Sequence, residues 1–326
     1  MGVADRLVDY RRKRDPEKTP EPVPRQRGRP GRGDTFVIQE HHARALHWDL
    51  RLERDGVLVS WAVPKGLPPD PKVNHLAVHT EDHPMEYASF EGEIPAGEYG
   101  GGQVRIWDRG TYETEKWSDR EVKFVLHGER SEGRYVLFRT RGKNWMIHRM
   151  DGPAPGWEPM PAGVSPMTPV RRARLPRNPG RYAFEFAWEG RRGLAAVEGG
   201  RLTLRDPAGE DITERWLRPL GGELGSRSAL LDGVIAEVEG VEVYVVFDLL
   251  YAEGRALLAE PFDRRRSLLE ELGIGGARWQ TAPSFPGEGA AVRAAARERG
   301  LPAVIAKRRD SPYIPGESDA WLCIPI

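Results

Sequence analysis

The stretch FVIQEHHARALHWDLRLE, residues 36–53, carries three histidines, Asp49 and two arginines between apolar residues. Apolar and polar residues alternate over residues 46–52, which is the period of a half-buried β-strand. One face of that strand would carry His47, Asp49 and Arg51. Side chains two residues apart on one face stand roughly 7 Å apart at a rise of about 3.3 Å per residue, so an imidazole and a carboxylate can converge on one metal ion. The stretch therefore predicts a strand that bears a chemical site.

Short strand-like segments follow this stretch at close intervals, separated by Pro/Gly turn signals and without a helical period. They are Val57–Val63, His75–His79, Gln103–Trp107, Glu121–His127, Arg134–Phe138 and Trp145–Arg149. This spacing is typical of an antiparallel β-barrel or sandwich. We expect Trp48, Trp61, Trp107 and Trp145 to be core residues, because each lies in an apolar strand run. We expect Gly100–Gly102 to form a turn, since no helix pattern follows it.

The second half of the chain has a different sequence pattern, in which helical stretches join the predicted strands. Residues 262–273 (FDRRRSLLEELG) and 287–300 (GEGAAVRAAARERG) are predicted helices that stop at glycines. The fold class is thus β followed by α+β. The predicted organisation is a basic, partly disordered arm at 1–34, a β-barrel domain at 35–152, a Pro/Gly-rich linker at 153–178 and a second domain at 179–326.

The charge balance gives no global argument for a nucleic-acid partner. Lys+Arg and Asp+Glu both number 49, so an anion-binding surface must be local. The arm concentrates positive charge in RRKR (Arg11–Arg14) and in RQRGRPGRG (Arg25–Gly33). Such segments are either solvated tails or arms that contact phosphates.

The single cysteine, Cys323, excludes an intrachain disulfide and fits a reducing compartment, so we expect a cytoplasmic protein. No apolar run approaches the roughly 20 residues of a membrane helix, and the N-terminus lacks the apolar region of a signal peptide. The expected partners therefore do not include a membrane.

Three interpretations of the histidine cluster remain open from the residues alone. In the first interpretation, the histidines are ordinary surface or core residues. In the second, they belong to a non-haem iron oxygenase whose second histidine is His83 or His148. In the third, they belong to a metal-assisted phosphoesterase. The third interpretation is favoured by nearby cations suited to phosphate oxygens, namely Arg51, Arg14 and Lys65.

Three separated segments resemble a known family. FVIQEHHARALHWDLRLERDGVLVSWAVPKG, EDHPMEYASFEGEIPAGEYGGG and VRIWDRGTYE are similar to the 3′-phosphoesterase module of bacterial nonhomologous end-joining ATP-dependent DNA ligases, over about residues 10–150. The resemblance implies a β-barrel enzyme that removes a 3′-phosphate and a 3′-terminal ribonucleoside from DNA ends. It also implies Mn2+ as the preferred metal, with other divalent metals as substitutes.

The same resemblance assigns roles to individual residues. It implies that the metal ligands are His41, His47 and Asp49. The phosphate and transition-state residues are Arg51, His83 and Tyr87, with His83 acting either on phosphoryl charge or as the acid for the leaving oxygen. The supporting, substrate-binding positions are Arg14, Asp15, Glu21, Gln39, Lys65 and Glu81. One basic contact departs from the family pattern, because His75 stands where the family has an arginine.

The second half is similar, in motif order, to the nucleotidyltransferase domain of ATP-dependent DNA ligases over about residues 165–326. The segments are RYAFEFAWEGRRG, VFDLLY, AVIAKRRDSPYIPG and WLCIPI. In that family a lysine attacks ATP and holds AMP as a phosphoramidate. Here Ala187 stands at that position, followed by Glu189 in place of an aspartate, although Gly190 and Arg192 match.

Further departures affect two acidic positions and two phosphate-binding lysine positions of the family's motifs. Val234 and Pro302 stand where acidic residues are expected, and Cys323 and Pro325 stand where lysines are expected. Phe247, at the adenine-stacking position, and Lys307 remain. The resemblance therefore implies a degenerate adenylation domain that is catalytically inactive and serves as a scaffold for DNA ends or partners.

The function expected from the sequence is a manganese-dependent DNA 3′-end-healing phosphoesterase that works in double-strand break repair in the cytoplasm, at the nucleoid. Its partners would be DNA 3′ ends and a Ku-like protein, a separate ligase or a polymerase. The alternative is a noncatalytic DNA-end-binding accessory that recruits a separate ligase or Ku-like partner.

Overall fold

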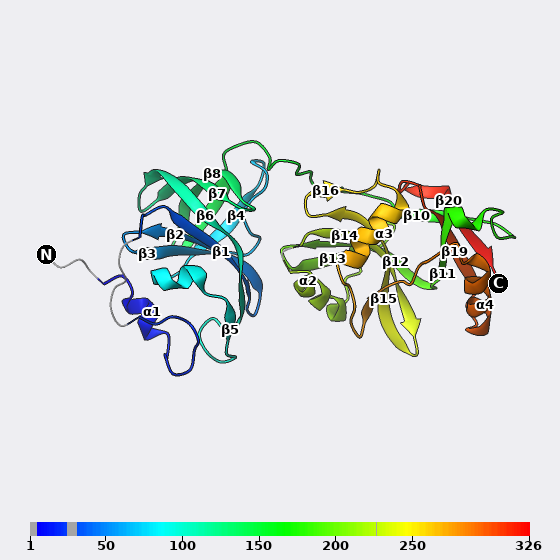
Figure 1. Ribbon diagram of the computed structural model, residues 1–326, viewed down its shortest axis with the longest axis horizontal. Helices are drawn as coiled ribbons and strands as arrows, with labels where there is room; N and C mark the ends of the chain where they lie inside the picture. The colour runs from blue at the N-terminus through cyan, green and yellow to red at the C-terminus, as the bar shows by residue number, and fades with distance from the viewer. Residues whose placement is uncertain (1–4, 25–30, 226) are drawn as a thin grey trace. The chain divides into compact units, whose positions relative to one another are not determined.

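The computed structural model describes residues 5–24, 31–225 and 227–326 and divides into two compact units, Met1–Trp157 and Glu158–Ile326 (Figure 1). Each unit has its own hydrophobic core. The boundary falls within the stretch 153–178 that the sequence predicts as a linker. In the described ranges no helix is long and apolar enough to cross a membrane.

The first unit is a closed antiparallel β-barrel, as the sequence predicts. Its strands are β1 (Thr35–His42), β2 (Leu46–Arg54), β3 (Val57–Val63), β4 (Asn74–His79), β5 (Gly92–Ile94), β6 (Gly102–Trp117), β7 (Glu121–Gly128), β8 (Glu132–Arg141) and β9 (Asn144–Arg149). Eight of them pair in the order β1-β2-β3-β4-β9-β8-β7-β6, and β6 pairs back to β1 to close the barrel. β5 pairs with the start of β6.

The long strand β6 makes closure possible, because its first part pairs with β1 and its last part with β7. The switch occurs at Gly110, which is opposite both Phe36 and Gly128. A Cβ at Gly110 would collide with the carbonyl oxygen of His127. The glycine thus permits the close backbone approach that the corner of the barrel requires.

The barrel core is filled by the apolar face of the alternating strands. Trp48, Leu50 and Leu52 of β2 are buried, as are Trp61 and Trp145. The predicted core role is confirmed for these three tryptophans. Trp107 is only partly buried against the core, and the Arg130 guanidinium lies 5.4 Å from its ring centroid.

The N-terminal arm is more ordered than its composition indicates over residues 5–24. It forms α1 (Val8–Arg12), which buries Leu7 and Tyr10 against the barrel. Residues 25–30, most of the second basic run, lie outside the described residues. The arm and η1 (Met85–Ser89) cover the polar face of β2, where Asp49 and Arg51 are buried. The expectation of a half-buried β2 is therefore wrong, because the strand is buried on both faces.

The second unit is α+β, as predicted. One sheet has the order β10-β20-β19-β11-β18. It consists of β10 (Met167–Arg171), β11 (Tyr182–Phe186), β18 (Phe285–Pro286), β19 (Ala303–Arg308) and β20 (Gly316–Pro325). β10 lies inside the predicted linker, but it pairs in parallel with β20 and buries Met167 completely. This part of the linker therefore belongs to the second unit.

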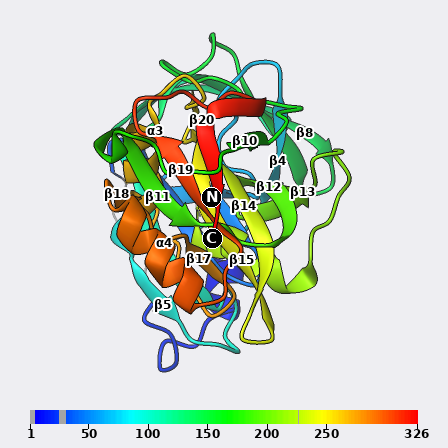
Figure 2. The same ribbon diagram turned by 90° about the vertical axis from the view of Figure 1, so that its right-hand side faces the viewer.

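A second sheet has the order β13-β12-β14-β15-β16, and β17 pairs with β15. Its strands are β12 (Gly190–Glu198), β13 (Arg201–Arg205), β14 (Ala229–Val238), β15 (Val241–Ala252), β16 (Arg255–Ala256) and β17 (Trp279–Thr281). The helical elements are η2 (Pro179–Arg181), η3 (Arg215–Leu217), α2 (Pro219–Glu223), α3 (Phe262–Glu271) and α4 (Gly289–Glu298). Helices α3 and α4 confirm both predicted helices. α4 packs on β11 and β19 (Figure 2).

Candidate active site

Three candidate metal ligands converge at the β1–β2 hairpin. The register places His41 opposite His47 and Gln39 opposite Asp49. The two imidazole centroids are 4.7 Å apart. One ligand atom from each of His41, His47 and Asp49 lies within 4.8 Å of the others. The hairpin thus joins residues that the alternation of β2 alone could only partly bring together.

Each histidine uses one ring nitrogen on a backbone carbonyl and presents the other nitrogen to Asp49. His41 donates from Nε2 to the Gly100 oxygen at 2.8 Å, and its Nδ1 lies 3.6 Å from Asp49 Oδ2. His47 donates from Nδ1 to the Ala45 oxygen at 3.0 Å, and its Nε2 lies 3.8 Å from Asp49 Oδ1. Such carbonyl bonds fix the tautomer of a metal-binding histidine. Two imidazole nitrogens and one carboxylate fit a first-row divalent cation.

Asp49 is held by Arg51, whose guanidinium is almost completely buried. Arg51 Nη2 donates to Asp49 Oδ2 at 2.8 Å, Nη1 donates to Ser60 Oγ at 2.9 Å and Nε donates to Gln39 Oε1 at 2.7 Å. Burial by itself would raise the pKa of Asp49, but Arg51 and the two neighbouring histidines outweigh it and hold the pKa well below its ordinary value. Asp49 is therefore an anion that is ready to bind a metal.

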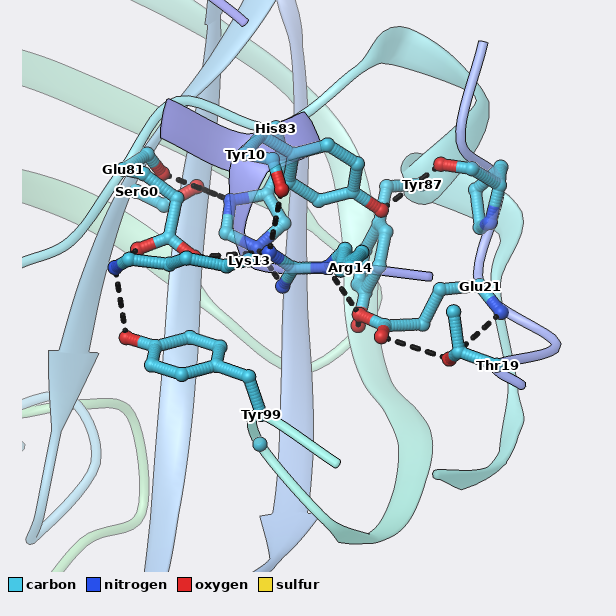
Figure 3. A network of polar contacts seen from close by, with 12 residues as sticks. Tyr10, Lys13, Arg14, Thr19, Glu21, Ser60, Glu81, His83, Tyr87 and Tyr99 are labelled. Atoms are coloured by element: carbon cyan, nitrogen blue, oxygen red, sulfur yellow. Dashed lines mark hydrogen bonds and ion pairs between the residues drawn. The ribbon is translucent and has the colours of Figure 1, made fainter. Parts of the chain in front are cut away.

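The arm places a second arginine in the same pocket (Figure 3). Arg14 donates from Nε to Glu21 Oε1 at 2.9 Å and from Nη1 to Glu81 Oε1 at 3.0 Å. Its guanidinium carbon lies 3.8 Å from the Tyr10 ring centroid. The Tyr87 hydroxyl donates to Glu21 Oε1 at 3.0 Å, and burial raises the pKa of Tyr87. Tyr87 is therefore a neutral hydrogen-bond donor at physiological pH.

His83 is a neutral imidazole in this arrangement. Its Nδ1 donates to the Glu81 carbonyl oxygen at 2.8 Å, and its Nε2 accepts from Arg14 Nη2 at 3.4 Å. Burial, followed by the charges of Arg51 and Arg14, lowers the pKa of His83 well below its ordinary value. His83 therefore carries no positive charge at neutral pH.

These groups line one open cavity of about 940 Å³. The predicted residues that line it are His41, His47, Asp49, Arg51, His83, Tyr87, Arg14, Glu21 and Glu81. Gln39 lies behind Arg51 and donates to the carbonyl oxygens of Tyr87 and Phe90. Asp15 binds Lys18 and Lys65 is exposed, and neither lines the cavity. His75, at the family's arginine position, also lies outside the lining and bonds to the Gly66 oxygen.

The glycine-rich loop between β5 and β6 contributes more to the site than the predicted turn. The predicted turn is confirmed as far as Gly101, since Glu98 N donates to the Pro95 oxygen and Gly101 N donates to the Glu98 oxygen, each at 3.1 Å, whereas Gly102 begins β6. The loop also lines the cavity and supplies the carbonyl that holds His41. A Cβ at Gly102 would collide with the His42 carbonyl, so the glycine is required for this approach. Sequence reasoning also missed Tyr10, Lys13, Thr19, Ser60 and Tyr99.

The ligase-like motifs of the second unit gather around a buried lysine. Ala187 follows β11 directly, and its backbone N–H donates to the Ala303 oxygen. Lys307 Nζ lies 2.8 Å from Glu185 Oε2, 4.5 Å from the Phe247 ring centroid and 4.3 Å from the Trp321 ring centroid. Burial lowers the pKa of Lys307 and raises that of Glu185. Arg192 is paired with Asp232 at 2.6 Å.

Two family models match the chain. The model of the DNA Ligase D 3′-phosphoesterase domain matches residues 39–139, and that of the ATP dependent DNA ligase domain matches residues 224–324. The chain is 48% identical to the multifunctional non-homologous end joining protein LigD of Mycobacterium bovis, over 98% of this chain and 45% of that protein. It is 33% identical to the protein of the same name from Pseudomonas aeruginosa, over 99% of this chain and 47% of that protein.

The chain thus spans about half the length of these curated relatives. Among solved structures, a mycobacterial DNA ligase D complexed with ATP and MES is 32% identical, with a TM-score of 0.45, and the match covers 50% of this chain and 60% of that one.

His83 should remain uncharged at pH 6, where an unperturbed imidazole with a pKa of about 6.5 is mostly protonated. Its pKa is lowered, so protonation begins only at a more acidic pH. The measurement is a pH titration of the His83 Cε1–H NMR signal in the metal-free full chain. Arg14→Met removes one of the cations that lower the pKa and should move the titration upward. Titration of His83 near pH 6.5 in the unsubstituted protein would contradict the assignment.

Proposed function

We propose, from the premise that this chain belongs to the ligase D family of non-homologous end-joining proteins, that its first unit is a metal-dependent DNA 3′-phosphoesterase. It would remove a 3′-phosphate, and a 3′-terminal ribonucleoside, from DNA ends during double-strand break repair in the cytoplasm. The observation that supports this proposal best is the convergence of His41, His47 and Asp49 in one cavity with Arg51 and Arg14.

The charge balance of the cavity supports metal dependence. Three cations are paired with three carboxylates: Arg51 with Asp49, Arg14 with Glu21 and Glu81, and Lys13 with Glu81. The formal charges of these six side chains sum to zero, and the other charged side chains that line the cavity, Arg44, Glu93 and Glu98, add one positive and two negative charges. A divalent cation held by the histidines and Asp49 would give this group a net charge of +2. The dianion of a phosphate monoester would meet net positive charge at this group only when the metal is bound, so phosphate binding should require the metal.

The residues of this chain would bind the phosphate and stabilise its transition state. Arg51 uses three of its five N–H donors on Asp49, Gln39 and Ser60, and its remaining donors suit phosphoryl oxygens. Mn2+ bound at His41, His47 and Asp49 would supply Lewis-acid polarisation of a phosphoryl oxygen and a lower pKa for a bound water. Attack of water on phosphorus then expels the nucleoside 3′-oxygen. Arg51 and Arg14 offset the charge that develops on the phosphoryl oxygens.

His83 has its unprotonated Nε2 directed at Arg14, so it cannot donate a proton from that atom in the unliganded protein. A bound phosphate dianion would offset the two arginines that hold the His83 pKa down. We infer that substrate binding raises this pKa and lets His83 take up a proton at Nε2. The imidazolium can then stabilise the phosphate or protonate the leaving oxygen.

We propose that the second unit does not form a lysyl-AMP intermediate. Ala187 lacks the amine that nucleophilic attack on ATP requires. Lys307 is the single lysine in residues 158–326 of the sequence. It is buried and paired with Glu185, so its amine is not free to replace the missing nucleophile. The unit would then serve as a scaffold for DNA ends, or for a Ku-like protein, a separate ligase or a polymerase.

His47→Ala and Asp49→Ala should each reduce phosphate release from a 3′-phosphate primer–template by at least roughly 100-fold in the presence of Mn2+, because each removes a metal ligand. His127→Ala is the matched control: this histidine is exposed on β7 outside the cavity, and its loss should leave the rate unchanged. Assays should compare metals on ends that carry a 3′-phosphate, a 3′-ribonucleotide or a 3′-hydroxyl. Full activity in either ligand variant would refute the metal assignment.

Incubation of the full chain with labelled ATP and a divalent metal should give no protein–AMP adduct of the acid-labile, alkali-stable kind that a lysyl phosphoramidate forms. The physical reason is the absence of an available lysine amine in the second unit. Lys307→Met provides the control that assigns any signal to its site. An adduct in the unsubstituted protein that disappears in this variant would show that the second unit is an active nucleotidyltransferase.

A further inference from the structure

Tyr99 is an exposed aromatic side chain at the rim of the catalytic cavity. It lies in the loop between β5 and β6, lines the cavity and is 49% exposed. Among the exposed large hydrophobic side chains of the described ranges, Tyr99 alone is aromatic. The mechanism developed above does not use it, and an exposed aromatic ring at a catalytic cavity requires an explanation.

The Tyr99 ring is held in place although it is exposed. Lys13 Nζ donates to the Tyr99 hydroxyl at 3.0 Å and lies 4.3 Å from the ring centroid (Figure 3). Lys13 is itself fixed by Glu81 Oε2 at 2.9 Å. Holding an exposed side chain in one conformation costs conformational entropy, and here that cost is already met in the free protein. A ring that is already ordered binds a flat ligand at a lower entropic cost.

The loop backbone fixes Tyr99 relative to the metal ligands. The next residue, Gly100, accepts the hydrogen bond from His41 Nε2, and the two 3.1 Å turn bonds close the loop around it. The Arg14 guanidinium carbon lies 5.6 Å from the Tyr99 ring centroid. The ring therefore stands beside the groups that would hold the phosphate, where the nucleoside attached to that phosphate would lie.

We propose that Tyr99 is the stacking platform for the terminal nucleobase of the DNA 3′ end. This inference rests on the proposed phosphoesterase function and assigns a base subsite to it. Stacking on an aromatic face accepts every base, because each has a π-face. An enzyme that heals broken ends of any sequence needs this type of contact. The cations beside the ring would bind the phosphate, while the ring would bind the base.

The test compares Tyr99→Leu, which removes the aromatic face, with Tyr99→Phe, which keeps the face and removes the hydroxyl. On a 3′-phosphate end with a normal terminal nucleotide, Tyr99→Leu should raise KM by roughly 5- to 150-fold, the range of stacking contributions per base, with little change in kcat. Tyr99→Phe should lose much less than Tyr99→Leu, because it gives up the hydroxyl bond to Lys13 but keeps the ring face and the Lys13 contact with it. On an end whose terminal nucleotide is abasic, all three proteins should show the same KM.

An equal loss in Tyr99→Leu on normal and abasic ends would overturn the base subsite, as would an equal loss in Tyr99→Phe and Tyr99→Leu. A second measurement does not depend on activity and uses the fluorescence of a 2-aminopurine base at the terminus of a DNA with a 3′-hydroxyl. This fluorescence should be quenched by the unsubstituted protein and by Tyr99→Phe but not by Tyr99→Leu. If quenching follows this pattern but no phosphate is released, the phosphoesterase proposal fails alone. If phosphate is released but Tyr99→Leu behaves like the unsubstituted protein in both assays, the base subsite fails alone.

Discussion

The buried ion pair between Asp49 and Arg51 is the constraint on which the site depends. A charge removed from water must be paired and hydrogen-bonded, and breaking such a pair costs about 3–5 kcal/mol. Arg51 meets this requirement with bonds to Asp49, Gln39 and Ser60, one on each of three adjacent barrel strands. The same pairing orients the Asp49 carboxylate toward His41 and His47. The barrel wall therefore positions the Asp49 carboxylate, while the Gly100 and Ala45 carbonyls orient the two histidines.

The arm and the glycine-rich loop, which are distant in sequence from the β1–β2 hairpin, complete this site. Arg14 reaches Glu81 and His83, and the Gly100 carbonyl orients His41. These contacts bring additional charge into a cavity where the buried Arg14 and Arg51 already have carboxylate partners. The result is a preorganised set of ion pairs without net charge, to which a divalent cation would add the charge that attracts phosphate. Ion pairing in the free protein lowers the cost of burying the arginines, and on the proposed function it would make the metal a condition for substrate binding.

Local patterns in the sequence predicted those parts of the structure that depend on short-range order. The alternation of residues 46–52 placed Asp49 and Arg51 on one face, and strand spacing indicated the barrel. The roles of His41, His83 and Tyr87 came from family resemblance, because their meeting depends on strand register and loop closure. Composition suggested partial disorder in an arm that buries Leu7 and Tyr10, since the surface that receives them is formed by distant residues. Lys65 lies near the motif in sequence, yet the turn that carries it leaves it exposed.

The central claim is that one divalent metal binds between the two histidines and Asp49. Anomalous X-ray diffraction from crystals of the full chain soaked in Mn2+ tests it most directly. We predict one strong peak within coordination distance of His41 Nδ1, His47 Nε2 and the Asp49 carboxylate, with the Gly100 and Ala45 carbonyl bonds preserved. Absence of a peak there at saturating Mn2+, or coordination through the opposite ring nitrogens, would contradict the account.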